Sequence, residues 1–405
     1  MASAEHHGVE VVFAVYLKRA AAAPATRIRA AQLATWAATV ARRWPEVRTW
    51  IGPNEPNQPR FWRPQFGRGC VNASGAAYAT ALGAMYDALK TVDADIQVLG
   101  SLSPRGNDLC RARSNVSTSP VRFLAALGKA YRRSRGRDPC TPLMDGLSFH
   151  PYPPRNQDPP AKGYVWPKIG LPDLGRLKQA FWDAFRGTCQ QTFGEGLPLH
   201  LNELGYQTAS RRSGYSGREN VTPISEARQG SFYAAAIARA ACDPAVASLN
   251  IFHLVDEAER ARFQSGLLRI DRTRKASFAP VRAAIVRAER GCGGRLTRWR
   301  PARRVIGAGV DFGRLGRSSP KRAAWTFRIV AREGASYDAG ILRAGDPPTA
   351  TPVLRASGRL RAQVRLLVRF RGRLAPGSYV YAARLRAEAN ASRMTTFVSK
   401  PFTVR

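Results

Sequence analysis

The fold is decided by residues 9–51, which read VEVVFAVYLKRAAAAPATRIRAAQLATWAATVARRWPEVRTWI. Residues 9–16 form a continuous apolar run rich in β-branched side chains, as in a parallel strand that is buried on both faces. Residues 27–44 then carry apolar side chains at helical spacing, and residues 47–51 form a second apolar run. A strand, a helix and a strand in this order predict a parallel βαβ unit.

The same alternation continues to about residue 290. The sequence predicts strands at 9–16, 47–51, 96–99, 143–149, 197–201 and 248–254. It predicts helices at 27–44, 74–91, 120–134, 172–192, 223–241 and 276–287. Strict alternation predicts a parallel sheet, and the lack of a Gly-rich loop after the first strand argues against an open dinucleotide-binding sheet. A closed (β/α)8 barrel has eight such units, of which six are visible here.

Beyond the last of these helices the periodicity changes. Residues 325–330, 363–370 and 379–385 alternate apolar with polar or small side chains, which is typical of antiparallel strands. We therefore expect two domains, an α/β barrel over residues 1–295 and an all-β immunoglobulin-like sandwich over residues 303–405.

Composition indicates a folded protein, with 44% hydrophobic and 9% aromatic residues among 405. No apolar run reaches the roughly 18 residues of a transmembrane helix, so no membrane span is expected. Residues 1–8 lack the charged start and apolar core of a signal peptide. Either the protein is cytoplasmic, or the recorded chain does not begin where the natural one does.

The formal net charge of +36 raises the alternative of a basic, nucleic-acid-associated protein. The arginines are, however, spread along the whole chain, and runs such as residues 132–135 are short. They also lack the interleaved aromatic residues of a single-strand binder. The distribution favours no specific nucleic-acid partner.

The six cysteines are far apart, and none forms a C-x-x-C pair. This spacing disfavours a zinc knuckle or a thioredoxin-like site. An even number in loop-like contexts predicts disulfides and therefore export from the cell, the alternative being unpaired buried thiols. The cysteines are Cys70, Cys110, Cys140, Cys189, Cys242 and Cys292.

Polar residues follow three of the predicted strands where each strand ends. Asn54 and Glu55 follow residues 47–51, His150 and Tyr152 follow the fourth predicted strand, and Glu203 follows the fifth. The carboxyl ends of parallel strands meet at one edge of a barrel, so these side chains should share one face. Glycosidic bond cleavage requires a pair of carboxyl groups in different roles. The alternatives are a surface turn for Glu55 and a capping role for Glu203.

Asn54-Glu55-Pro56 after one strand, with a second glutamate after a strand three units later, resembles clan A of the glycoside hydrolases over residues 9–290. These are eight-stranded barrel enzymes with the acid/base on strand 4 and the nucleophile on strand 7. Assigning residues 47–51 to strand 4 makes residues 197–201 strand 7. The resemblance implies retaining hydrolysis of O-glycosidic bonds in an oligo- or polysaccharide, with Glu203 as nucleophile and Glu55 as acid/base, and no cofactor.

The same resemblance implies roles for further residues. The His-x-Tyr after strand 6, found in families such as family 5, would place His150 at the sugar and Tyr152 in a hydrogen bond to the nucleophile. Asn54 would contact the sugar 2-hydroxyl. The clan's sugar-stacking tryptophan after strand 8 is absent, so Phe252 or His253 would take its place.

Trp62 lies in a long loop on the expected active face. A flat aromatic ring suits the C–H groups of a sugar, which makes Trp62 a candidate substrate-binding platform, with ordinary packing as the alternative. No His-Glu-x-x-His spacing suggests a metal site, and no G-x-S-x-G turn suggests a serine hydrolase.

Strands 1 and 2 of the clan's barrel have no counterpart here, nor has the arginine near the end of strand 2. We expect the recorded start to be internal to a longer reading frame, which would also account for the missing signal peptide of a secreted protein. The alternatives are a non-catalytic carbohydrate-binding protein or a truncated, inactive glycosidase homologue. The particular sugar, endo or exo action and the oligomeric state stay open.

Overall fold

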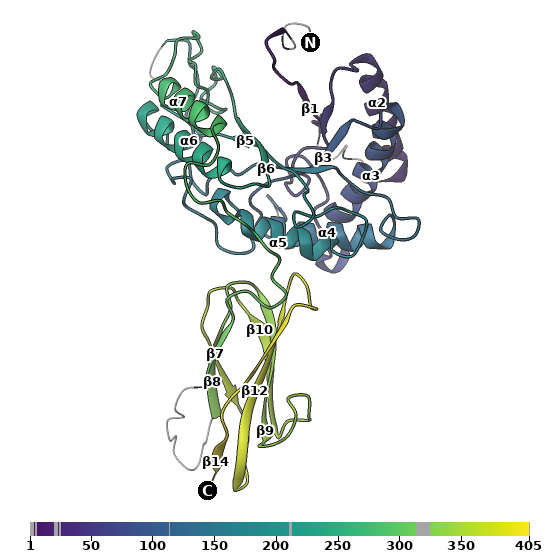
Figure 1. The fold of residues 1–405 in the computed structure, drawn as a ribbon, viewed down its shortest axis with the longest axis vertical. Helices are drawn as coiled ribbons and strands as arrows, with labels where there is room; N and C mark the ends of the chain where they lie inside the picture. The colour runs from purple at the N-terminus through teal and green to yellow at the C-terminus, as the bar shows by residue number, and fades with distance from the viewer. Residues whose placement is uncertain are drawn as a thin grey trace. The chain divides into compact units, whose positions relative to one another are not determined.

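The computed structural model describes residues 4, 6–19, 23, 26–112, 114–209, 213–312 and 325–404. The chain divides into two compact units (Figure 1). The first consists of Met1–Tyr164 and Lys168–Arg300, and the second of Val165–Pro167 and Pro301–Arg405.

The first unit is built on a parallel sheet that has six strands in the described residues, arranged in chain order. The strands are β1 (Val12–Ala14), β2 (Thr49–Ile51), β3 (Gln97–Leu102), β4 (Gly146–Phe149), β5 (Leu199–Leu204) and β6 (Val246–Ile251). The sheet curls into a half barrel, with β1 and β6 at its two edges (Figure 1). The predicted alternation of six strands and six helices is confirmed. The first strand is shorter than expected, and β1 pairs on one side only, with β2.

A helix follows each strand on the outer side of the sheet (Figure 1). Consecutive helices pack against each other, as α2 does on α3 and α6 on α7. The helices are α2 (Arg27–Arg43), α3 (Ser74–Val92), α4 (Pro120–Arg133), α5 (Leu174–Phe185), α6 (Glu226–Ala241) and α7 (Phe278–Glu289), with 3-10 turns at Arg68–Cys70 and Leu171–Asp173.

Helix α4 shows why these segments fold as they do. Leu124, Leu127 and Tyr131 recur at spacings of three and four residues and are all buried, so one stripe of the helix faces the protein interior. Gly128 lies in the same stripe, and a Cβ atom there would approach Cβ of Ala184 in α5 to 2.6 Å. The missing side chain therefore lets α4 and α5 pack closely.

Helix α5 is shorter than the predicted helix over residues 172–192. It ends at Phe185, whose carbonyl oxygen accepts a hydrogen bond of 2.6 Å from Thr188 Oγ1. Gly187 then adopts a φ of 69°, which lies outside the helical region. The predicted helix was too long because apolar residues continue at helical spacing beyond Phe185.

All six cysteines are paired in disulfides, and no cysteine is free in the described residues. The prediction of disulfides is therefore confirmed. The bonds are Cys70–Cys110, Cys140–Cys189 and Cys242–Cys292.

The second unit contains two antiparallel sheets in the described residues. One has the order β10-β9-β12-β13, with β14 also paired to β12, and the other has the order β11-β8-β7. The strands are β7 (Gly309–Asp311), β8 (Trp325–Val330), β9 (Ala335–Arg343), β10 (Leu354–Leu360), β11 (Leu366–Phe370), β12 (Gly377–Ala387), β13 (Met394–Val398) and β14 (Phe402–Val404).

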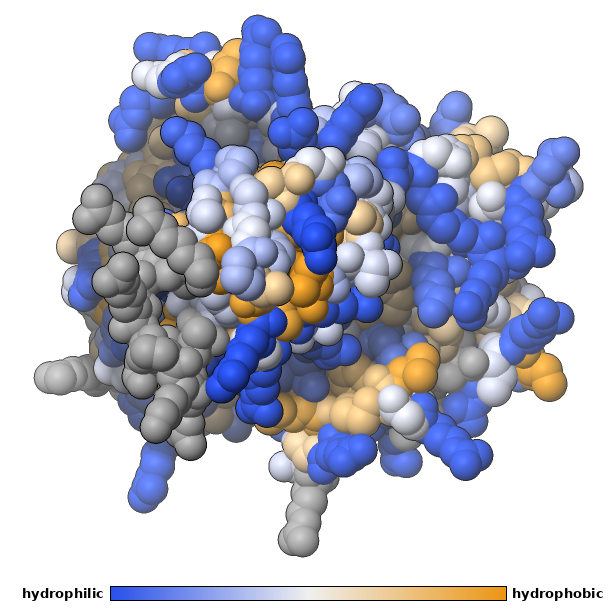
Figure 2. Space-filling model, turned by 90° about the horizontal axis from the view of Figure 1, so that it is seen from below, coloured by the Kyte–Doolittle hydropathy of each residue, from blue (hydrophilic) through white to orange (hydrophobic). Residues whose placement is uncertain are grey.

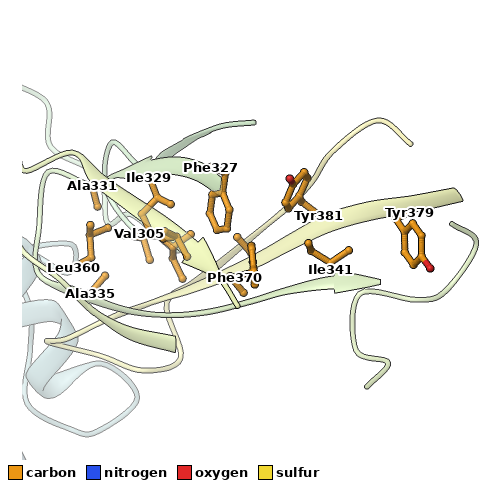
Figure 3. Packing of buried hydrophobic residues seen from close by; sticks show 14 of the residues in the cluster. Val305, Phe327, Ile329, Ala331, Ala335, Ile341, Leu360, Phe370, Tyr379 and Tyr381 are labelled. Atoms are coloured by element: carbon orange, nitrogen blue, oxygen red, sulfur yellow. The ribbon is translucent and has the colours of Figure 1, made fainter. Parts of the chain in front are cut away.

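One apolar cluster joins the two sheets of the second unit. Phe327 and Ile329 from β8 and Phe370 from β11 pack with Ile341 from β9 and Tyr381 from β12 (Figure 3). The predicted change to antiparallel β structure is confirmed, and the predicted strand 325–330 coincides with β8.

Two local features explain where the prediction for this unit was wrong. Strand β9 was not predicted, because Ile341 belongs to the shared cluster while its neighbour Leu342 is buried in a second cluster with Val380. Burial on both sides removes the two-residue alternation. Strand β11 begins later than the predicted residue 363, because Gln363 has a φ of 63°, which no strand accommodates.

No helix in the described residues is long and apolar enough to cross a membrane. The face shown in Figure 2 is mostly hydrophilic, with apolar side chains in small patches.

Candidate active site

Side chains from four strands meet at the carboxyl-terminal edge of the half barrel. Tyr16 follows β1, Glu55 follows β2, His150 and Tyr152 follow β4, and Glu203 lies in β5 one residue before its end. The polar residues predicted at strand ends thus lie together. Tyr16 joins them without having been predicted.

Glu55 is held in an uncommon backbone conformation. Its φ is 37°, in the left-handed region that side chains other than glycine rarely adopt. Two hydrogen bonds fix it: the Asn54 N–H donates to the Val15 carbonyl oxygen at 2.9 Å, and the Glu55 N–H donates to Ser101 Oγ at 3.0 Å. Strain of this kind persists where the surroundings determine the backbone, and it is concentrated at functional sites.

His150 lies between the two glutamates. Its Nδ1 is 2.9 Å from Glu55 Oε1 and 3.5 Å from Glu203 Oε2, and its side chain is only 1% exposed. Burial lowers the pKa of His150, but the hydrogen bond that its ring donates to Glu55 and the charges of Glu203 and Glu55 outweigh it, so the pKa lies above its ordinary value. The imidazolium form is therefore stabilised between the carboxylates.

Each oxygen of the Glu203 carboxylate accepts a hydrogen bond from a phenol. Tyr16 Oη donates to Oε1 at 2.6 Å, and Tyr152 Oη donates to Oε2 at 3.0 Å. Burial and the nearby carboxylates raise the pKa of Tyr16 and raise that of Tyr152 well above its ordinary value. Both phenols consequently stay protonated and act as donors throughout the neutral range.

The two carboxylates are close together and reach solvent. One oxygen of Glu55, one oxygen of Glu203 and a ring nitrogen of His150 all lie within 4.8 Å of one another. The Glu55 side chain is 12% exposed and that of Glu203 is 15% exposed. A ligand at the edge of the sheet can therefore reach both carboxylates.

The same three side chains could hold a divalent cation, since each offers one ligand atom. In the structure these atoms already have partners. His150 Nδ1 is engaged with Glu55 Oε1, and both oxygens of Glu203 accept from phenols. These atoms therefore take part in hydrogen bonds among the side chains of the site.

Aromatic rings lie beside Tyr152. Its ring centroid is 6.5 Å from that of Phe252 and 6.3 Å from that of Phe263. His253 follows Phe252 across a cis peptide bond, with ring centroids 3.7 Å apart. The predicted candidates Phe252 and His253 thus lie next to a residue of the site, and their contact with a sugar stays a prediction. Phe263, in the loop after β6, also lies beside Tyr152 and was not among the predicted candidates.

The remaining two candidates are buried. Asn54 is 4% exposed, and its contact with a sugar stays a prediction. The prediction that Trp62 is a sugar platform is wrong for this structure, because the side chain is fully buried and packs edge to face on Tyr78, with centroids 5.7 Å apart. A ring without exposed surface cannot stack on a ligand.

Comparisons with known proteins give a likeness in structure only. No protein-family model matches the chain, and no curated protein matches it. The catalytic domain of Ignisphaera aggregans GH53 is 13% identical, with a TM-score of 0.45 over 70% of this chain and 76% of that one. A glucosidase from Croceicoccus marinus is 10% identical, with a TM-score of 0.46 over 91% of this chain and 77% of that one.

The GH10 xylanase of Thermobacillus composti is 12% identical, with a TM-score of 0.40 over 69% of this chain and 78% of that one. By their descriptions these three structures are glycoside hydrolases. At these identities and TM-scores the likeness assigns neither a family nor an activity, and the function is inferred from the side chains at the edge of the sheet.

Proposed function

We propose that the chain hydrolyses O-glycosidic bonds in an oligo- or polysaccharide with retention of the anomeric configuration. The observation that carries this proposal is the approach of one Glu55 oxygen and one Glu203 oxygen to within 4.8 Å at a solvent-accessible edge. Retaining glycosidases hold their two carboxyl groups about 5–5.5 Å apart, whereas inverting enzymes separate them by about 6.5–9.5 Å to admit a water. The short separation favours the retaining reaction.

The partners of the two carboxylates support different roles. Glu203 accepts hydrogen bonds at both oxygens from phenols that stay protonated, and such bonds stabilise the ionised carboxylate that a nucleophile needs. Glu55 instead shares a hydrogen bond with His150, a group that can itself take up or release a proton. We therefore assign Glu203 as nucleophile and Glu55 as acid/base.

The reaction then proceeds in two displacements. A Glu203 oxygen bonds to the anomeric carbon while Glu55 gives its proton to the glycosidic oxygen, and the leaving group departs as an alcohol. Glu55 next takes a proton from water, the hydroxyl bonds to the anomeric carbon, and the bond to Glu203 breaks. Each residue ends in its starting state, and no cofactor takes part.

Two further parts of the proposal concern context. Three disulfides support a protein made for an oxidising compartment, and we place it outside the cytosol. Two antiparallel sheets around one apolar cluster support an immunoglobulin-like sandwich for the second unit.

The test is glycoside turnover with its stereochemistry. Aryl glycosides of several sugars and soluble polysaccharides are incubated with the wild type and with Glu203→Ala, and proton NMR follows the first-formed anomer. Glu46→Gln is the matched control, because Glu46 is an exposed glutamate that precedes β2, at the end of the strand opposite to Glu55. We expect turnover with retention that Glu203→Ala abolishes and Glu46→Gln preserves.

Other outcomes identify the rival functions. Glycan binding without turnover in the wild type indicates a carbohydrate-binding protein, and salt-dependent DNA binding without glycan recognition indicates a nucleic-acid-associated one. Turnover abolished by EDTA and restored by a divalent cation would assign Glu55, His150 and Glu203 to a metal site instead.

A further inference from the structure

Tyr16 donates the shortest of the hydrogen bonds to the Glu203 carboxylate, at 2.6 Å. It comes from the end of β1, whereas Tyr152, the donor to the other oxygen, comes from the end of β4. The carboxylate of β5 is thus held by one phenol on each oxygen, from two different parts of the sheet.

The backbone around Tyr16 is fixed to the segment that carries Glu55. The Val15 N–H donates to the Ile51 carbonyl oxygen at 3.1 Å, and the Asn54 N–H donates to the Val15 carbonyl oxygen at 2.9 Å. The Tyr16 ring also packs edge to face on Phe61, with centroids 6.0 Å apart. The phenol is therefore aimed at Glu203 by the same backbone contacts that set the position of Glu55.

The charge on Glu203 changes during the proposed reaction. In the glycosyl-enzyme intermediate Glu203 is a neutral ester, and it regains a full negative charge only as its bond to the anomeric carbon breaks. Hydrogen bonds to a charged acceptor are about twice as strong as those between neutral groups. A phenol on this carboxylate therefore stabilises Glu203 most when it departs, in the second displacement.

We propose that Tyr16 promotes the second displacement by donating its O–H to Glu203 as the glycosyl–Glu203 bond breaks. This inference rests on the proposed function. The pKa of Tyr16 is raised by burial and by Glu203, so the phenol keeps its proton while the carboxylate forms. Tyr16 as a whole residue is 51% exposed, and only its hydroxyl end lies within the site, so little of its role is core packing and Tyr16→Phe should fold as the wild type does.

The experiment is pre-steady-state and steady-state kinetics with a dinitrophenyl glycoside, whose leaving group departs easily and makes the second displacement rate-limiting. Tyr16→Phe removes only the hydroxyl. When the second displacement slows, kcat and KM fall together while kcat/KM, which reports only the first displacement, stays nearly constant. We expect kcat to fall about ten- to a hundredfold, the change for losing a hydrogen bond to a charged group, with a burst of dinitrophenolate.

Tyr86→Phe is the matched control, because Tyr86 Oη donates to the Asp145 carboxylate at 3.3 Å, in the same unit but away from the site. It should leave kcat, KM and the burst as in the wild type. Thermal melting followed by circular dichroism should give both variants the wild-type Tm within a few degrees.

The two proposals fail in different ways. If the wild type shows no Glu203-dependent release of dinitrophenolate, the proposed function fails and the role of Tyr16 falls with it. If the wild type turns over but Tyr16→Phe either matches it or loses kcat/KM as much as kcat without a burst, the proposed function stands and the role of Tyr16 is refuted.

Discussion

Two clusters in the first unit combine a carboxylate with tyrosine and a basic side chain. They differ in how deeply the carboxylates are buried and in how many basic partners each carboxylate has. In the first, Asp256 Oδ1 accepts from Lys275 Nζ at 2.7 Å, and Oδ2 accepts from Tyr215 Oη at 2.9 Å. Lys275 also donates to Thr208 Oγ1 and to the Gln264 carbonyl oxygen, and both ionic side chains are 1% exposed.

In the second cluster, two carboxylates face one imidazole and two phenols. Glu55 and Glu203 share one basic side chain, His150, and both reach solvent. Buried, fully matched charges such as Asp256 and Lys275 specify a packed loop. Two carboxyl groups held close together at an accessible edge with one basic partner are costly to stability, and such groups cluster at functional sites.

The largest effect on activity is expected from removal of the proposed nucleophile. Glu203→Ala should lower kcat on the order of 10⁵-fold, because no group remains to form the covalent intermediate. Stability should change little, since relief of the crowding of two carboxyl groups offsets the loss of the hydrogen bonds from Tyr16 and Tyr152. Glycoside turnover and urea unfolding measure the two effects, and added azide should restore release of the leaving group with an inverted azide product.

A substitution in the buried cluster should instead lower the free energy of unfolding more than it lowers activity. Lys275→Met leaves the Asp256 carboxylate buried without its ammonium partner, which should lower the free energy of unfolding by about 3–5 kcal/mol. A Lys275→Met/Asp256→Asn double variant should recover part of that loss. A Lys275→Met protein as stable as the wild type in urea would contradict the structural role given to the buried cluster.

Removal of the acid/base should have a smaller effect that depends on the leaving group. Glu55→Gln should lower kcat/KM about 10²- to 10⁴-fold for alkyl glycosides, where protonation of the departing oxygen matters most. For a dinitrophenyl glycoside, which needs no proton, the loss in kcat/KM should nearly vanish. Equal losses for both leaving groups would argue against the assigned role.

The smallest expected effect is a change in the pH dependence of stability. Because the pKa of His150 is raised in the folded protein above 6.5, its contribution is fully present below pH 6.5 and is lost as pH rises through the folded value. His150→Gln should therefore flatten the fall in Tm as the pH rises above 6.5. Melting curves between pH 5 and pH 9 measure it against the wild type.

The sequence could predict those site residues whose position follows from a local pattern. Glu55 and Glu203 were found because a buried parallel strand has an unmistakable apolar run, and a strand's end fixes which edge its next residues occupy. Tyr16 stands at the end of the first such run, so the same rule would have found it. It was passed over because a tyrosine that closes an apolar run looks like part of the strand.

Other features could not be predicted because they depend on contacts between distant segments. Trp62 looked available for a ligand, since only its packing on Tyr78 in α3 shows that the loop folds inward. Strand β9 lost its alternation because both of its faces are covered. The resemblance implied the hydrogen bond from Tyr152 to Glu203, but the bond from Tyr16 required the curvature of the sheet, which no local pattern encodes.

The three disulfides have a consequence for how the protein would respond to proteolysis. Each closes a loop that contains one strand and one helix: β3 with α3, β4 with α5, and β6 with α7. His150 and Tyr152 lie inside the second loop, and Phe252 inside the third. A protease that nicks the chain once within any of these loops leaves its fragments covalently joined, so the nicked protein should run as one band on a non-reducing gel and separate only after reduction.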